Sequence, residues 1–167
     1  MTGRRRIETA EDAERLYLFD QTIYPAAVAL DRGLYLAAGE MLPELNFVLD
    51  GGRGHLACLP LRREAYEGLR AGRLHEGDLR REDLGLGGAL YLCSMYGADV
   101  EAGFEIFQVL RGVRGRLGAY AVTAAGKRAC LRLGMRVVRE DEEDGRAVGT
   151  EVVPAFLELG PELGDDR

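Results

Sequence analysis

The stretch YGADVEAGFEIFQVL, residues 96–110, contains side chains whose types and spacing could do chemistry. Its pattern predicts a strand end, a Gly-containing turn and an amphipathic helix, and the N-terminus of such a helix commonly binds a phosphate. Glu105 lies in the first turns of that helix, where the anion would bind. Two interpretations are open. Either the carboxylate offsets the helix dipole and occupies the anion site itself, or it points to solvent and the anion binds backbone at residues 95–97 with Arg111 or Arg114.

No motif for a general base is present in the sequence. Ser94, Tyr96 and Asp99 lie at the end of a predicted strand, residues 89–97, where they could exchange protons with a ligand. A strand-end tyrosine, however, more often packs or forms surface hydrogen bonds. A lone histidine in a strand, such as His55, is usually structural.

Spacing excludes several other kinds of site. Cys58, Cys93 and Cys130 are widely separated in apolar runs, which indicates reduced core thiols and, with two histidines in the chain, no metal site. The GLGG run, residues 85–88, lacks the Gly-Lys-Ser/Thr of a phosphate loop. The acidic turn, residues 140–145, lacks the spacing of a calcium loop. No Gly-x-Ser-x-Gly elbow indicates a hydrolase.

Charge excludes further classes of partner. The net charge is −6 over 167 residues, and the acidic excess lies in the acidic turn and the C-terminal tail. This argues against a nucleic acid or a membrane surface as partner. No segment approaches the length of a membrane-spanning helix, so we expect a cytoplasmic protein.

The chain is predicted to form one domain, residues 1–160, followed by an acidic tail, residues 161–167. Helices interrupt a strand-rich pattern, which predicts an α+β or mixed α/β class. In the helix after residue 97, Phe104, Phe107, Leu110, Val113 and Leu117 are expected to form one apolar face. The other predicted elements are a strand (4–9), a helix from Thr9 to Pro25, a helix (31–42), a hairpin (45–61), a short helix (62–72), the central strand (89–97), a strand (118–124), a helix (125–134) and a terminal hairpin.

Three stretches in this order are similar to the GNAT superfamily of acyl-CoA-dependent N-acyltransferases. They are LPLRREAYEGLRAGRLHEGDL (59–79), LYLCSMYGADVEAGFEIFQVL (90–110) and AYAVTAAGKRACLRLGMRVV (119–138). The resemblance implies a central, mixed, mostly antiparallel sheet of six to seven strands flanked by about four helices. It also implies acetyl-CoA or another acyl-CoA as cofactor and a small-molecule or peptide amine as acceptor.

The resemblance also implies site residues. Cys130 takes the place of a tyrosine general acid four residues before the Gly of the family's LGF, although a small buried cysteine is the simpler interpretation. Ser94 and Tyr96 are the other catalytic candidates. The implied cofactor contacts, mostly through backbone, are Met95, Gly97, Ala102, Gly103, Phe104, Glu105, Ile106, Phe107 and Arg111.

The sequence departs from the family's pyrophosphate pattern of Arg or Gln, two spacers, Gly, one spacer, and Gly or Ala. Those positions fall on Ala102, Glu105 and Phe107. A carboxylate there would repel a phosphate by on the order of 1 kcal/mol at an effective dielectric constant of about 20. Two functions are therefore expected as alternatives: an N-acyltransferase, or a GNAT-fold protein that has lost CoA binding and acts as a binding or regulatory module, for example as a homodimer.

Overall fold

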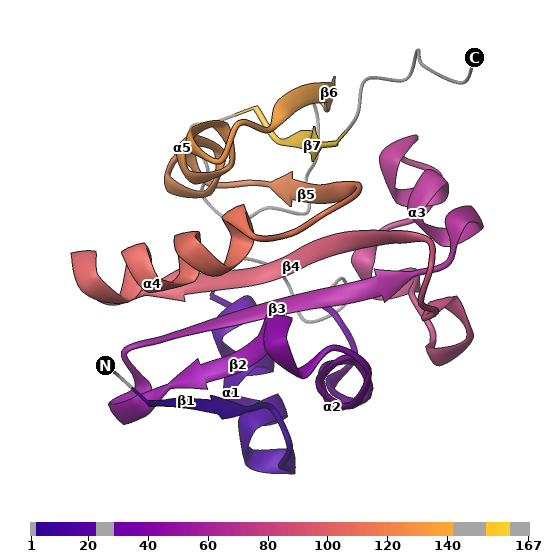
Figure 1. Cartoon of the computed structure of the whole chain (residues 1–167). Coiled ribbons are helices and arrows are strands. Elements are labelled where there is room, and N and C mark those ends of the chain that lie inside the picture. Colours follow the sequence, from indigo (N-terminus) through magenta and orange to yellow (C-terminus); the bar gives the residue numbers. More distant parts are fainter. Residues whose placement is uncertain (1–2, 23–28, 142–152, 161–167) are drawn as a thin grey trace.

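A computed structural model describes residues 3–22, 29–141 and 153–160 of the chain. Seven strands form one sheet in the order β1-β2-β3-β4-β5-β7-β6 (Figure 1). Within the described residues, β4 and β5 pair in parallel and every other pairing is antiparallel. The strands are β1 (Arg4–Arg6), β2 (Asn46–Leu49), β3 (Gly54–Leu61), β4 (Ala89–Gly97), β5 (Leu117–Ala121), β6 (Arg136–Glu140) and β7 (Ala155–Leu159).

Five α-helices lie in the described part of the chain, against about four expected. They are α1 (Ala10–Asp20), α2 (Arg32–Met41), α3 (Arg63–Arg70), α4 (Val100–Arg111) and α5 (Ala124–Arg132). The predicted α+β class and mostly antiparallel sheet are confirmed. None of these helices is long and apolar enough to cross a bilayer. Pro25, the acidic turn beyond residue 141 and the tail from residue 161 lie outside the described residues.

Helix starts follow from local side chains. Thr9 and Asp12 form a reciprocal capping box at the N-terminus of α1. The carboxylate of Asp31 accepts a hydrogen bond from the backbone N–H of Gly33 and caps α2. These contacts satisfy backbone donors that have no partner within the helix.

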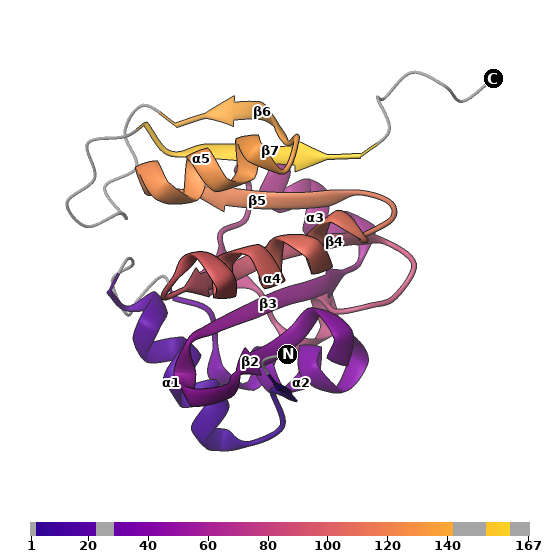
Figure 2. The same cartoon turned by 60° about the vertical axis from the view of Figure 1, so that its left-hand side comes forward.

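Two cores lie on opposite faces of the sheet. One contains buried side chains of α1, α2 and α3. The other lies under α4 and α5, which both cover the same side of the sheet in Figures 1 and 2. The sheet is therefore apolar on both faces, as expected for the central strand β4.

The predicted apolar face of α4 is correct at Leu110, which is buried, but wrong at Phe104. Phe104 is 63% exposed, and the buried residues of the helix are Ala102, Ile106 and Leu110, which recur every four positions. The helix ends at Arg111, so Leu117 belongs to β5. Apolar residues occur on two sides of this helix, and spacing alone does not show which side meets the sheet.

The parallel pairing of β4 with β5 is short, and the two strands then separate. Their pairing covers Leu90 to Leu92 of β4, and β4 then continues to Gly97 beside β3 alone. Cys93 is an extra residue at the point of parting, because Ala57 opposes Ser94 while Cys58 opposes Leu92. Such a β-bulge bends a strand and increases its twist. Beyond the bulge, the edge of β4 that faces β5 has no strand neighbour among the described residues.

Where β4 ends, its backbone closely approaches the first turn of α4. A Cβ atom placed on Gly97 would lie 2.7 Å from the backbone N and 2.9 Å from the Cα of Gly103. A Cβ atom on Gly103 would meet nothing within 4 Å. Gly97 is therefore required for packing of the strand against the helix, whereas Gly103 leaves open space beside the helix backbone.

The substitution Gly97→Ala should lower the free energy of unfolding by ~1–3 kcal/mol, because the added methyl group overpacks backbone that cannot rotate away. The matched change Gly103→Ala should raise it by ~1 kcal/mol, because alanine favours a helix and has room here. Urea denaturation monitored by circular dichroism measures both values. Equal effects of the two substitutions would contradict the close approach.

Candidate functional site

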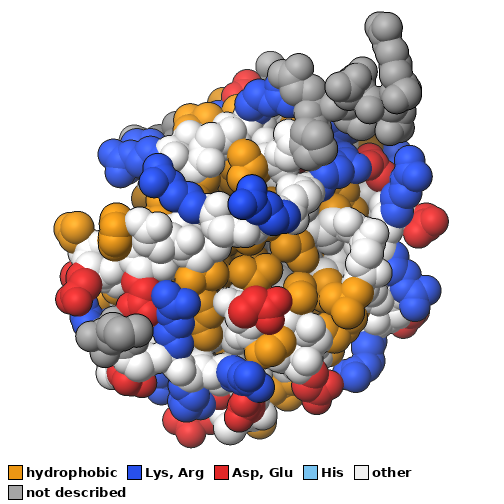
Figure 3. Space-filling view, in the orientation of Figure 1, with side chains coloured by type: hydrophobic (Ala, Val, Ile, Leu, Met, Phe, Trp, Pro, Cys, Tyr) orange, Lys and Arg blue, Asp and Glu red, His pale blue; other side chains and the backbone are white. Residues whose placement is uncertain are grey.

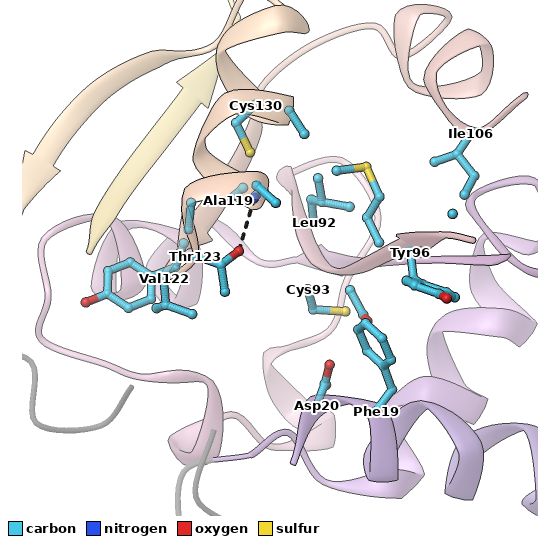
Figure 4. Close-up of a pocket in the computed structure, with 18 of the residues that line it drawn as sticks. Phe19, Asp20, Leu92, Cys93, Tyr96, Ile106, Ala119, Val122, Thr123 and Cys130 are labelled. Atoms are coloured by element: carbon cyan, nitrogen blue, oxygen red, sulfur yellow. Dashed lines mark hydrogen bonds between the residues drawn. The ribbon is translucent and has the colours of Figure 1, made fainter. Parts of the chain in front are cut away.

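A cavity of about 460 Å³ lies where β4 and β5 part (Figure 4). Its walls come from four parts of the chain: the end of α1, β4 from Leu92 to Gly97, α4 from Gly103 to Phe107, and the end of β5 with α5 as far as Cys130. The cavity thus connects both faces of the sheet, because α1 packs on one face and α4 and α5 on the other. We call it the cleft.

Most of the residues singled out in the sequence line this cleft. Eight of them do so: Ser94, Met95, Tyr96, Gly97, Gly103, Ile106, Phe107 and Cys130. Four do not contribute to its wall: Ala102, Phe104, Glu105 and Arg111. Ala102 is buried, Phe104 is exposed, and Arg111 lies in the last turn of α4, away from Gly103.

Glu105 points away from the cleft. Its Oε1 atom lies 2.6 Å from Nε of Arg4, a residue of β1. This ion pair places the carboxylate on the side of α4 that faces the N-terminal edge of the sheet. The sequence left two interpretations open, an acid that occupies the anion site and an acid that points to solvent, and neither included this ion pair with Arg4.

The N-terminus of α4 is already capped by acidic side chains. Oδ1 of Asp99 accepts a hydrogen bond from the backbone N–H of Ala102 at 2.8 Å. Arg53 pairs with Asp99 at 3.0 Å and with Glu101 at 2.8 Å. The hydrogen bond from Arg53, with that from Ala102, lowers the pKa of Asp99. A phosphate at this helix end would have to compete with Asp99 for the backbone donors.

Asp20 is the main residue of the cleft that was not predicted. It is the last residue of α1 and only 2% exposed, yet its side chain lines the cleft beside Phe19 (Figure 4). The hydroxyl groups of Tyr35 and Ser94 both donate hydrogen bonds to its carboxylate. Burial raises the pKa of Asp20 to about 7, and the bond from Ser94 partly offsets this effect.

Ser94 also contacts a histidine on the neighbouring strand. Nε2 of His55 lies 2.8 Å from Oγ of Ser94. Burial lowers the pKa of His55 to about 4, with a smaller contribution from Arg15, so the ring is neutral at pH 7. The hydroxyl lies between the imidazole and the carboxylate of Asp20. A Ser-His-Asp triad needs the imidazole in the middle, so this arrangement is not that of a serine hydrolase.

A second buried acid lies behind Asp20. Glu76 belongs to a 3-10 turn, Glu76–Asp78, in the connector between α3 and β4 and is 7% exposed. Its Oε1 atom accepts a 2.5 Å hydrogen bond from the hydroxyl of Tyr91, and Oε2 is buried without a hydrogen-bond partner among the described residues. Burial, followed by the charge of Asp20, raises the pKa of Glu76 to about 8.

The three cysteines are protonated thiols at neutral pH. Burial raises the pKa of Cys130 to about 11 and that of Cys58 to about 12. It also raises the pKa of Cys93, where the charge of Glu76 adds to the effect. Within the described residues, no group of three or more His, Cys, Asp or Glu side chains could hold a metal ion.

Among the comparisons with known proteins, the search of solved structures gives a likeness of fold. No protein-family model matches the sequence, and no curated protein matches it. A crystal structure of NAA60 from Arabidopsis thaliana in complex with acetyl-CoA is similar to this chain, with a TM-score of 0.49 and 16% sequence identity. The match covers 96% of this chain and 100% of that chain. The seven-stranded, mostly antiparallel sheet itself agrees with the sheet of six to seven strands that the sequence resemblance implied.

Alkylation by iodoacetamide tests the state of the thiols. At neutral pH, Cys130 and Cys93 should react at least about 100-fold more slowly than a free cysteine, because their raised pKa values leave little thiolate. Mass spectrometry of each peptide over time gives the rates, and the protein unfolded in guanidinium is the control in which all three thiols react quickly. Fast reaction of Cys130 in the folded protein would contradict its burial.

Proposed function

We propose that this chain is a cytoplasmic N-acyltransferase that moves an acyl group, such as acetyl, from an acyl-CoA to an amine. The observation that supports this best is the cleft between the parted parallel strands, with the first turns of α4 and α5 at its walls. Acyl-CoA supplies an activated acyl group as a thioester at the end of a slender pantetheine arm. Two features of this chain suit such an arm: the shape of the cleft and the backbone groups that line it.

The cleft offers main-chain groups to an arm that contains amides. From residue 93 to Gly97, the edge of β4 on the cleft side has no strand neighbour among the described residues, so its N–H and C=O groups need other partners. Gly103 adds open space beside the backbone of α4. An N–H group of β4 near Met95 could also polarise a thioester carbonyl, since a fixed donor stabilises charge that develops on that oxygen.

Cys130 is suited to one proton transfer. It lies on the α5 wall of the cleft, and Figure 4 shows its sulfur directed toward the other lining residues. Because burial raises the pKa of this thiol to about 11, it holds its proton at pH 7 and could donate it to a leaving thiolate. We therefore retain Cys130 as the candidate general acid of the proposed reaction.

The surface charge around the cleft is uneven. In the space-filling view, Lys and Arg side chains gather over α5, whereas Asp and Glu side chains lie at the N-terminal end of α4 (Figure 3). Arg128 and Arg132 of α5 are exposed, and Lys127 pairs with Glu140 at 2.9 Å. The basic side of the cleft is thus the more suitable side for the phosphates of a coenzyme.

One observation favours the second candidate, a non-catalytic binding module. The N–H group of Ala102 is already bound by Asp99, and Glu101 adds a further carboxylate at the same helix end. A coenzyme diphosphate would be repelled there unless Arg53 exchanged its acidic partners for the phosphates. Measured binding of the coenzyme therefore separates the two functions.

Isothermal titration calorimetry with acetyl-CoA tests the proposal. The wild-type chain should bind it saturably, and Gly103→Leu should weaken binding by ~10–100-fold, because a side chain there fills the open space beside the helix. The control is Glu105→Gln, which should change the dissociation constant by less than about 2-fold, since that carboxylate faces Arg4.

The opposite results identify the alternative. If neither acetyl-CoA nor free CoA binds at millimolar concentration, the chain is not an acyltransferase and the binding-module function stands. If Glu105→Gln changes the affinity as much as Gly103→Leu does, the coenzyme does not occupy the cleft described above.

A further inference from the structure

The charge of the cleft indicates what kind of acceptor it takes. Among the described residues that line it, Asp20 is the only one with a carboxylate, ammonium or guanidinium group. It lies at the α1 end, across the sheet from the walls formed by α4 and α5. A buried carboxylate without a cation is costly, so a cationic group entering at this end would gain its charge partner there.

The carboxylate is held in place from two sides. Tyr35 of α2 and Ser94 of β4 both donate hydrogen bonds to it, and Ser94 is itself fixed by His55. With two donors already bound, the carboxylate keeps unused acceptor capacity on the side of the cleft, since two oxygens provide about four acceptor positions. Figure 4 shows Asp20 with an oxygen directed toward the cleft.

Aromatic rings flank this carboxylate. The ring of Phe19 lies 5.0 Å from that of Tyr96 and 4.8 Å from that of His55, measured between centroids. Phe19 and Tyr96 both line the cleft. Such rings suit an apolar body attached to a cationic nitrogen, because they contact both alkyl groups and ammonium groups favourably.

Glu76 lies behind Asp20 and is coupled to it electrostatically. The two acids interact, because the charge of Asp20 contributes to raising the pKa of Glu76. At neutral pH, Glu76 therefore keeps its proton while Asp20 is ionised in part of the molecules. A cation bound to Asp20 favours the ionised form and adds attraction that a neutral ligand does not receive.

We infer that the α1 end of the cleft binds the acceptor, a primary amine with a small apolar body, and that Asp20 binds its ammonium group and removes one proton. This inference rests on the proposed acyltransferase function and names its substrate class and its general base. The supporting contacts are those of Asp20 with Tyr35 and Ser94 and the two aromatic rings beside it.

The proton balance of the step is complete. An N–H bond of the ammonium breaks, the proton moves to a carboxylate oxygen of Asp20, and the electron pair left on nitrogen attacks the thioester carbonyl. When the C–S bond breaks, the thiol of Cys130 donates a proton to the leaving thiolate, and the second proton lost by nitrogen passes through solvent to Cys130 and restores its thiol. The products are the amide and the thiol, and Asp20 releases one proton to solvent.

The inference gives a pH dependence. The titratable and polar groups that face Asp20 are Tyr35 on α2, Ser94 and Cys93 on β4, and Glu76 in the connector, with His55 behind Ser94. Only the ionised carboxylate accepts a proton, and the pKa of Asp20 is raised to about 7. The value of kcat/KM for an amine should therefore rise as the pH increases through about 7.

The variant Asp20→Asn tests this step, because an amide of the same shape still accepts hydrogen bonds but takes no proton. The substrates are acetyl-CoA with 2-phenylethylamine, butylamine or tyramine. In the variant, kcat should fall ~100–1,000-fold, and the rise of kcat/KM near pH 7 should disappear. Calorimetry should show amine binding weakened at least about 10-fold, with 2-phenylethanol as the neutral control ligand. Asp50→Asn, an exposed aspartate in the β2–β3 turn, removes one charge outside the cleft and should change neither value.

Stability separates this role from a structural one. Because the pKa of Asp20 is higher in the folded than in the unfolded state, the folded state loses stability as the pH rises toward and through about 7. Asp20→Asn should therefore raise the Tm at pH 8 while it lowers activity. A purely structural aspartate would give a lower Tm instead.

Two results would overturn the inference. It is wrong if none of the three amines binds, or if Asp20→Asn leaves amine affinity and the pH profile unchanged while acetyl-CoA still binds. If acetyl-CoA binds neither wild type nor variant, the acyltransferase function itself fails. Binding of acetyl-CoA is therefore measured first, on both proteins.

Discussion

The parting of β4 from β5 is the constraint on which the rest of the structure depends. The two strands share three residue pairs, and the extra residue Cys93 then turns β4 away from its neighbour. Closing the gap would require the N-termini of α4 and α5 to move, since each helix begins a few residues after its strand ends. The cleft therefore results from the strand geometry and does not depend on a single side chain.

The polar interior follows from that gap. A continuous sheet would leave no place for an ionisable group between its two cores. Here the end of α1 reaches the open edge of β4, and Asp20 is held by hydroxyl groups from α2 and β4. Burial then raises the pKa values of Asp20 and Glu76, because both lose the hydration that stabilises their ionised forms. Raised acidic pKa values of this kind concentrate at functional sites.

The acidic residues of α4 have a different role from the buried acid Asp20 in the cleft. Glu105 pairs with Arg4, and Asp99 and Glu101 pair with Arg53, so the acids of this helix serve contacts between distant parts of the chain. The two ion pairs of Arg53 are partly exposed to solvent and therefore contribute modestly to stability. A phosphate that binds at this helix end would have to replace Asp99 and Glu101 as the partners of Arg53.

Local signals in the sequence determined the positions of the elements. The capping residues Thr9 and Asp31, the glycines after Asp50 and the apolar run of β4 each act within a few residues, so strand and helix starts could be predicted. The strand-turn-helix segment was also sufficient to identify one wall of the cleft. Ser94, Met95, Tyr96, Gly97 and Gly103 all lie there.

Only the tertiary structure decided which side chains meet. The pairing of Glu105 with Arg4 spans 101 residues, and Asp20 reaches Ser94 across a comparable stretch of chain, so neither contact leaves a trace in local spacing. The choice between two apolar sides of α4 likewise depended on the packing of Ile106 against the sheet. Sequence patterns report interactions between near neighbours, whereas the direction of a carboxylate in a cleft depends on charges and donors that folding brings from other strands and helices.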